Sequence, residues 1–301
     1  MHAERAALRP DLLLLGIDGG GTKCRARLCA PSGAILGEGV AGPANIRLGL
    51  ENSLAAVRQA TNACLQQAGL TSSDLPRIAA CLALAGASEP AALAAAQAEK
   101  YPFGHTTITT DADAACVGAH GGRDGGVIVV GTGTIGWAVL KGRRHRVGGW
   151  GLLVSDEGSG AWLGREALRQ VLWAHDGRVP WTVLLRILFK QFQNDPHAIV
   201  RWTAEASPRD FGSFAPRVVE HAKHGDPAGI ELMQLAAAHI DALGARLIAL
   251  GTSRLSLAGG LAVHMQPWLS PGIQTYLVTP AGDALDGALQ LARVDAESIA
   301  A

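Results

Sequence analysis

Residues 12–23, LLLLGIDGGGTK, constrain the fold more than any other part of the 301-residue chain. The apolar run ends at Asp18, three glycines follow, and residues 24–30 alternate polar and apolar side chains. This pattern predicts a buried strand, a tight glycine turn and a half-buried strand. Because glycines carry no Cβ, such a turn can bring backbone N–H groups against an anion, with the acid beside it facing hydrated Mg²⁺. The alternative is a plain glycine-rich hairpin with an acid at its rim.

Two familiar nucleotide-binding motifs are excluded by their context. Residues 16–23 approach the P-loop pattern, but the order is Gly-Thr-Lys where a P-loop has Gly-Lys before Ser or Thr, and a strand follows in place of a helix. The GxGxxG at 131–136 follows the apolar run 127–130, yet residues 137–140 favour another strand where a dinucleotide site needs a helix. We therefore expect neither a P-loop nor a Rossmann site.

The composition excludes several classes of partner and compartment. Lys plus Arg equals Asp plus Glu at 26 each, so we expect no nucleic-acid partner and no membrane partner. The first apolar run is too short for a signal peptide, and no stretch predicts a transmembrane span. The cysteines form no CxxC pair and no metal spacing, which predicts buried free thiols in a reducing cytoplasm; they are Cys24, Cys29, Cys64, Cys81 and Cys116.

Periodicity predicts alternating strands and helices along the whole chain. In the first half we expect strands at 12–18, 24–30, 34–41, 78–85 and 106–110, and helices at 48–68, 90–100 and 112–119. In the second half we expect strands at 127–130, 135–140, 255–258 and 274–278, and helices at 161–174, 181–192, 195–206, 209–224, 228–250 and 283–293. The result is an α/β protein with mixed sheets flanked by helices.

The opening hairpin is repeated after a glycine-rich segment at 118–126. There an apolar strand, a glycine turn at 131–134 and a second strand follow one another again. We therefore predict two related domains, 1–119 and 120–301, on either side of a cleft that binds a small molecule.

Taken together, the glycine loops resemble those of sugar kinases in the actin-like ATPase superfamily. The motifs DGGGTK, GPAN, ALAG, TTDADAA, GTGT, GWGLLVSDEGSGAWLG and LAGGLA occur in that order. Within the superfamily, the chain from about residue 12 to residue 292 is similar to the N-acetylglucosamine kinase and bacterial glucosamine kinase group, which is related to the activator ATPases of 2-hydroxyacyl-CoA dehydratases. The resemblance implies two ribonuclease-H-like domains with ATP between them, a final helix near the hinge, and a homodimer.

The resemblance also implies which residues bind the nucleotide. Two glycine turns would hold the ATP phosphates and one glycine pair would pass close to the adenosine; these residues are Gly19, Gly20, Gly21, Thr22, Gly131, Thr132, Gly133, Thr134, Gly259 and Gly260. Asp18 would hold Mg²⁺, through water.

The resemblance implies that Asp111 is the catalytic base, since it stands where the family's base stands and a carboxylate there can accept the proton of the attacking sugar hydroxyl. Two other interpretations stay open. Asp111 can be the N-cap of the helix at 112–119, where a carboxylate tends to stay ionised, and Asp113 is a rival for the base.

The resemblance implies a sugar site made of Asn45, Gly86, Asp111, Gly149, Trp150, Gly151 and Asp156. Three of these have structural alternatives. Asn45 can be a turn residue, Trp150 a core tryptophan and Asp156 an acid near a helix N-terminus. Glu157 is expected to act only through its neighbours.

The resemblance implies an ATP-dependent kinase that phosphorylates the 6-hydroxyl of glucosamine or N-acetylglucosamine, with a slight preference for free glucosamine because the chain is similar to the bacterial enzymes throughout. One alternative is an activator ATPase, whose relatives use cysteines to bridge an iron–sulfur cluster. The other is a sugar sensor that binds without phosphorylating.

Overall fold

The computed structural model describes residues 11–300 and divides into two units. The first unit contains residues 11–125, 139–144 and 279–300, and the second contains residues 126–138 and 145–278. This division differs from the boundary expected between residues 119 and 120, because the C-terminal helix belongs to the first unit. The chain crosses between the units four times, because that helix and the segment 139–144 both belong to the first unit.

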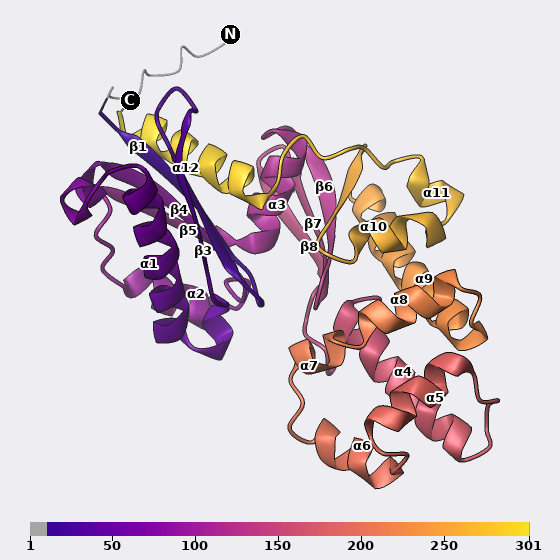
Figure 1. Ribbon diagram of the computed structural model, residues 1–301. Coiled ribbons are helices and arrows are strands. Elements are labelled where there is room, and N and C mark those ends of the chain that lie inside the picture. The colour runs from indigo at the N-terminus through magenta and orange to yellow at the C-terminus, as the bar shows by residue number, and fades with distance from the viewer. Residues whose placement is uncertain (1–10, 301) are drawn as a thin grey trace. The chain divides into compact units, whose positions relative to one another are not determined.

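The first unit is built on a five-stranded mixed sheet of order β3-β2-β1-β4-β5. Strand β1 pairs antiparallel with β2 and parallel with β4, which pairs parallel with β5. The predicted mixed sheet is confirmed (Figure 1). The strand bounds are β1 (Leu13–Gly19), β2 (Cys24–Cys29), β3 (Ile35–Ala41), β4 (Ile78–Leu84) and β5 (His105–Thr110).

Helices cover both faces of this sheet because successive strand residues point to opposite sides. Leu13, Leu15 and Ile17 face the core shared with α1 (Leu50–Gln67) and α2 (Pro90–Ala98). Leu14 faces the other core, where α3 (Asp111–His120) and α12 (Ala284–Ala300) pack. The four-residue apolar run that begins the chain's first strand is thus buried on both sides.

The second unit has a four-stranded sheet of order β8-β7-β6-β9, in which β9 pairs parallel with β6. Its strands are β6 (Gly125–Val130), β7 (Thr134–Leu140), β8 (Arg143–Gly148) and β9 (Leu255–Ala258). The order repeats that of β3-β2-β1-β4, as expected for the repeated hairpin. Strand β8 was absent from the expected elements, because RRHRVG lacks the apolar alternation of a half-buried strand.

The helices of the second unit show that one expected helix and one expected strand are wrong. They are α4 (Gly160–His175), α5 (Val183–Gln191), α6 (Pro196–Thr203), α7 (Pro208–Gly212), α8 (Ala215–Lys223), α9 (Pro227–Ala249), α10 (Ala262–Met265) and α11 (Pro271–Gln274). The single helix expected at 209–224 is wrong, because Pro216 has no N–H for the Gly212 carbonyl and the chain divides into α7 and α8. The strand expected at 274–278 is also wrong. Pro271 begins a short helix there, and only an isolated bridge joins Leu277 to Leu255.

One helix in the described part of the chain, α9, is long and apolar enough to cross a membrane by length and composition, contrary to the expectation that no stretch would be. It packs against α8 and α4 in the structure and buries one side, including Leu232, Met233 and Ile240.

Candidate active site

The carboxyl ends of β1, β4 and β5 bring four predicted site residues to one edge of the first sheet. Asp18 is the second-last residue of β1, Gly86 is the second residue after β4, and Asp111 comes directly after β5. Asn45 joins the same edge through a parallel bridge to Ala85. Parallel strands place their carboxyl ends together, so this clustering follows from the topology.

The first glycine turn, residues 19–22, is tied to this edge on one side and open to solvent on the other. The Gly19 and Gly20 carbonyls accept hydrogen bonds from the Ala85 and Ala44 amides at 2.7 and 3.0 Å. Gly21 and Thr22 are exposed. The turn therefore has a fixed base and an open rim that an anion can approach.

Asp18 is paired with an arginine that the sequence analysis did not single out. Arg25 on β2 donates to Asp18 Oδ2 from Nη2 and Nε at 2.7 and 3.1 Å, and from Nη1 to Asp283 Oδ2 at 2.8 Å. The antiparallel register places Arg25 opposite Asp18. One guanidinium thus holds the end of β1 and the residue before α12.

The donor set at Asp18 fits Mg²⁺. Mg²⁺ at phosphate-transfer sites is bound by one or two carboxylates, with waters and substrate phosphates completing the shell. Both Arg25 bonds reach Oδ2, so Oδ1 carries no bond to that guanidinium. Among the described residues there is no cluster of three His, Cys, Asp or Glu side chains that could hold a metal without such help.

Asp111 is the first residue of α3, and the N-cap is Thr110, so the expected N-cap role is wrong. The Thr110 hydroxyl accepts the Asp113 amide at 2.9 Å, while Asp111 Oδ1 accepts the Ala112 amide at 2.9 Å. Loss of solvent, and then the nearby charge of Asp18, raise the pKa of Asp111 to about 6. Hydrogen bonds from the backbone amides of Ala112 and Asp111 lower the pKa and oppose this shift only in part.

Asp113, the rival for the base, is engaged in structural contacts. Its side chain is 1 % exposed and accepts hydrogen bonds from Arg144 Nε at 2.9 Å to both oxygens and from the Thr109 hydroxyl at 2.8 Å. A buried carboxylate held in this way already has a cation as its partner. Of the two acids, Asp111 has no such cation among the described residues.

Asn45 and Gly86 lie against each other. Asn45 caps a short 3₁₀ helix by accepting the Arg47 amide at 3.1 Å, so the turn role expected as an alternative is real. Gly86 has φ +85°, and a Cβ there would lie 2.6 Å from Asn45 Oδ1. Only glycine fits beside the amide.

The second glycine turn, residues 131–134, lies at the N-terminus of α4. The carbonyls of Gly131 and Thr132 accept the amides of Gly160 and Ala161 at 2.8 and 3.2 Å. Gly131 N–H also closes the turn onto the Gly133 carbonyl at 2.9 Å. The Thr134 hydroxyl is buried and has no hydrogen-bond partner in the described structure.

Trp150 is 63 % exposed, which excludes the core role left open for it. The Arg146 guanidinium stacks 3.8 Å from its ring centroid and donates to the carbonyls of Gly148 and Gly149. A ring held by one face in this way is available to a ligand on its other side.

Asp156 joins the loop at Gly149–Gly151 to the second turn. Its Oδ1 accepts the Gly151 amide at 3.2 Å, and a Cβ on Gly133 would lie 2.7 Å from Oδ2. Desolvation raises its pKa. Helix α4 begins at Gly160 with Ser159 as its N-cap, and Asp156 precedes the N-cap and lies outside the first turn of the helix.

Gly259 and Gly260 follow β9 and are exposed. Gly259 has φ +93°, and a Cβ there would lie 2.4 Å from the Val130 carbonyl oxygen. The same carbonyl accepts the Leu261 amide at 3.0 Å. The glycine pair is thus packed on the end of β6, next to the second turn.

Two arginines beside these residues were missed. Arg25 could have been found, because in a hairpin centred on the glycine turn it is the residue opposite Asp18. No sequence signal pointed to Arg146, since β8 itself was not recognised.

Residues 15–292 match the BadF/BadG/BcrA/BcrD ATPase family. The glucosamine kinase GspK of Vibrio cholerae is 42% identical over 278 residues, covering 92% of this chain and 95% of that protein. A solved structure from Chromobacterium violaceum, provisionally named an N-acetylglucosamine kinase, has 34% identity and a TM-score of 0.88, covering 94% of this chain and all of that one.

A more distant structure shares the fold. The ROK family glucokinase of Streptomyces griseus, solved with glucose and AMPPNP, has a TM-score of 0.55 at 17% identity and covers 94% of this chain and 99% of its own. These matches agree with the two helix-covered sheets and with the motifs at their edges. The chain belongs to the BadF/BadG/BcrA/BcrD ATPase family.

Proposed function

We propose that this protein is an ATP-dependent amino-sugar kinase that transfers the γ-phosphoryl group of ATP to the 6-hydroxyl of glucosamine or N-acetylglucosamine. The observation that carries the proposal is the state of Asp111. It lies at the sheet edge with Asp18, its pKa is raised to about 6, and no arginine or lysine of the described chain pairs with it. A general base works best when its pKa is close to the working pH.

In this proposal Asp111 accepts the proton of the 6-hydroxyl as that oxygen attacks the γ-phosphorus. Asn45, Gly86, Gly149, Trp150, Gly151 and Asp156 bind and orient the sugar. Short, fixed polar groups suit this task because little conformational freedom is lost on binding.

The two glycine turns and the Gly259–Gly260 pair bind ATP, and Asp18 holds Mg²⁺. The chemistry that Mg²⁺ supplies is neutralisation of charge on the transferring phosphoryl group. Arg25 fixes the Asp18 carboxylate while leaving Oδ1 available. The names of the relatives, a glucosamine kinase and an N-acetylglucosamine kinase, support this assignment.

The family also contains ATPases of other functions, so the activator alternative needs an argument. All five cysteines are buried free thiols, as predicted, and the Cys116 thiol donates to the Gly125 carbonyl. Buried thiols with raised pKa values are poor ligands for a shared iron–sulfur cluster. This observation favours the kinase.

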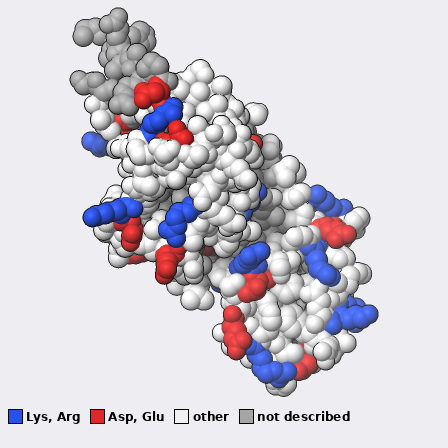
Figure 2. Space-filling model, turned by 60° about the vertical axis from the view of Figure 1, so that its left-hand side comes forward, with Lys and Arg blue, Asp and Glu red and all other residues white. Residues whose placement is uncertain are grey.

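We further propose a cytoplasmic homodimer with no nucleic-acid or membrane partner. The unpaired buried thiols support a reducing compartment. On the face that Figure 2 shows, acidic and basic side chains are intermixed and neither sign forms a continuous patch, as expected for a chain of zero formal net charge. The dimer rests on the resemblance alone.

The test is a coupled ADP-release assay with Mg-ATP and glucosamine, N-acetylglucosamine, glucose or no sugar. We expect turnover that requires an amino sugar and falls by roughly 10²–10⁴ in Asp111→Asn. Asp176→Asn, an exposed acid at the end of α4, is the matched control and should keep full activity. ADP release at the same rate with and without each sugar would favour the activator ATPase. Sugar binding without ADP release would favour the sugar sensor.

A further inference from the structure

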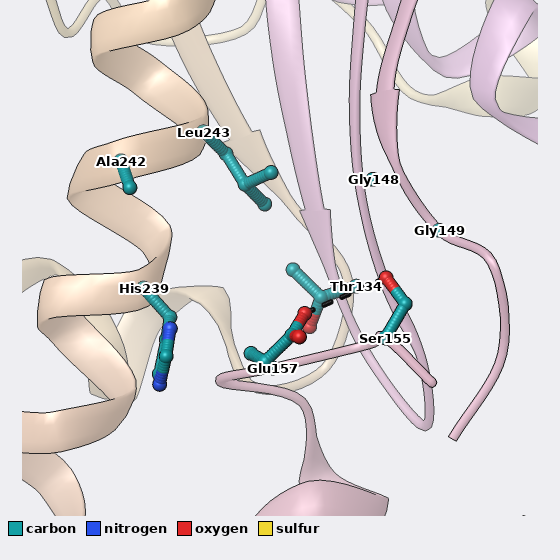
Figure 3. Close-up of a pocket in the computed structure, with 8 residues that line it drawn as sticks. All are labelled: Thr134, Gly148, Gly149, Ser155, Glu157, His239, Ala242 and Leu243. Carbon is teal, nitrogen blue, oxygen red and sulfur yellow. Dashed lines mark hydrogen bonds between the residues drawn. The ribbon is translucent and has the colours of Figure 1, made fainter. Parts of the chain in front are cut away.

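A crevice of about 220 Å³ opens in the second unit between α9 and the loops that follow β6 and β8 (Figure 3). Figure 3 shows the Glu157 carboxylate directed toward Thr134, and the His239 imidazole projecting from α9. The polar residues that line the crevice are Thr134, Ser155, Glu157 and His239, and the other lining residues are Gly148, Gly149, Ala242 and Leu243.

The charge of this lining is negative. Glu157 is the one carboxylate among the lining residues, and no arginine or lysine is among them. Its hydrogen bond in the described structure comes from the Ser155 hydroxyl at 3.4 Å, and no described arginine or lysine forms an ion pair with it. Asp18 and Asp113, by contrast, each have an arginine. A half-buried carboxylate without a cation favours a positively charged ligand and disfavours phosphate.

Thr134 gives a second and independent sign of a ligand. Its residue is 3 % exposed, and its hydroxyl has no hydrogen-bond partner in the described structure. A buried hydroxyl left unpaired is costly, and such exceptions in native proteins are often explained by a bound group. The crevice therefore combines an acceptor carboxylate with a lining residue whose buried hydroxyl is unpaired.

The crevice adjoins the residues assigned to the sugar. Gly149 belongs to both, and Asp156 lies between Ser155 and Glu157 in the chain. The other charged groups at this corner are His239, Asp156 and Arg146, which stacks on Trp150 and donates to the Gly148 and Gly149 carbonyls. A sugar bound by Gly149 and Asp156 can thus direct one ring substituent into the crevice.

We infer that this crevice binds the 2-amino group of glucosamine as an ammonium, with Glu157 as its carboxylate partner, so that the protein selects free glucosamine over glucose and N-acetylglucosamine. The inference rests on the proposed function and assigns its substrate. A hydroxyl or an acetamido group carries no charge, and either would leave the Glu157 carboxylate without a cation. Hydrogen bonds to charged groups are strong enough to discriminate about ten- to hundredfold.

The experiment compares kcat/KM for glucosamine, glucose and N-acetylglucosamine in the full-length wild type, Glu157→Gln and Glu231→Gln. Glu231 is an exposed acid on the same helix as His239 and is the matched control. We expect the glucosamine-to-glucose ratio of kcat/KM to fall about ten- to hundredfold in Glu157→Gln and to stay unchanged in Glu231→Gln. The loss should lie mainly in KM, because the ammonium is bound equally before and during phosphoryl transfer.

A wild type that prefers glucosamine, together with an unchanged ratio in Glu157→Gln, would overturn the inference and leave the proposed kinase intact. A wild type that phosphorylates none of the amino sugars would refute the proposed function, and the inference with it. If Glu157→Gln does not fold, Glu157→Asp provides the test, since shortening the side chain should lower the same ratio.

Discussion

Replacing Asp111 by asparagine should remove activity and also stabilise the folded protein at neutral and alkaline pH. Desolvation and the charge of Asp18 raise the Asp111 pKa from 3.8 to about 6. A raised carboxyl pKa means that folding favours the protonated form. The wild type therefore loses stability as the pH rises from about 4 to about 6, and the loss is complete above that range.

The structure sets the size of the effect. A folded pKa of about 6 and an unfolded pKa of about 3.9 correspond to a ceiling of about 3 kcal/mol at high pH. Asp111 keeps partial contact with solvent, so we expect a smaller value. From about pH 4.5 to about pH 8, the free energy of unfolding of Asp111→Asn minus that of the wild type should increase by about 1–2 kcal/mol.

Urea unfolding of both proteins without nucleotide, at these two pH values, measures this growth. Asp176→Asn is the control, because an exposed acid should give a difference that hardly changes with pH. If Asp111→Asn has the same advantage at both pH values, or is less stable than the wild type at pH 8, Asp111 is not a desolvated carboxylate. The pKa argument for its role as a base would then be refuted.

Three further predictions concern the framework around the site. Asp113→Ala should lower the free energy of unfolding by about 2–4 kcal/mol in urea titrations, because it leaves Arg144 and Thr109 without their buried partner. Gly259→Ala should lower both the melting temperature and the affinity for ADP, since its Cβ would meet the Val130 carbonyl; Gly260→Ala, with nothing within 4 Å of its Cβ, should leave the melting temperature unchanged. Burial raises the pKa of all five thiols, so a disulfide reagent should label them slowly in native protein and rapidly in urea. Rapid labelling of native protein would contradict that prediction.

Residues directly after strands could be predicted from the sequence. Asp18 and Gly86 follow apolar runs and Asp111 follows the threonine-rich strand β5, and parallel pairing of these strands is enough to bring the three residues to one edge. The same reasoning could not recognise β8, whose charged residues carry no apolar alternation, or the break before Pro216 within a continuous helical pattern.

Contacts that depend on long-range packing could not be predicted. The crevice beside Glu157 needs α9, whose His239 is distant in the sequence. Whether an aspartate is neutralised is equally a question of packing, since Asp111 and Asp113 are two residues apart on α3 and only Asp113 meets an arginine.

The packing of α12 has a consequence for synthesis of the chain. This helix covers one face of β1, with Ala288 and Ala292 in the same core as Leu14. Ribosomes make β1 and α3 before the second unit and α12 after it, so the part of the Leu14 face that α12 covers stays exposed while the second unit is made. Nascent chains should therefore complete the second unit before the first and hold an apolar sheet surface, suited to chaperone binding, until α12 emerges.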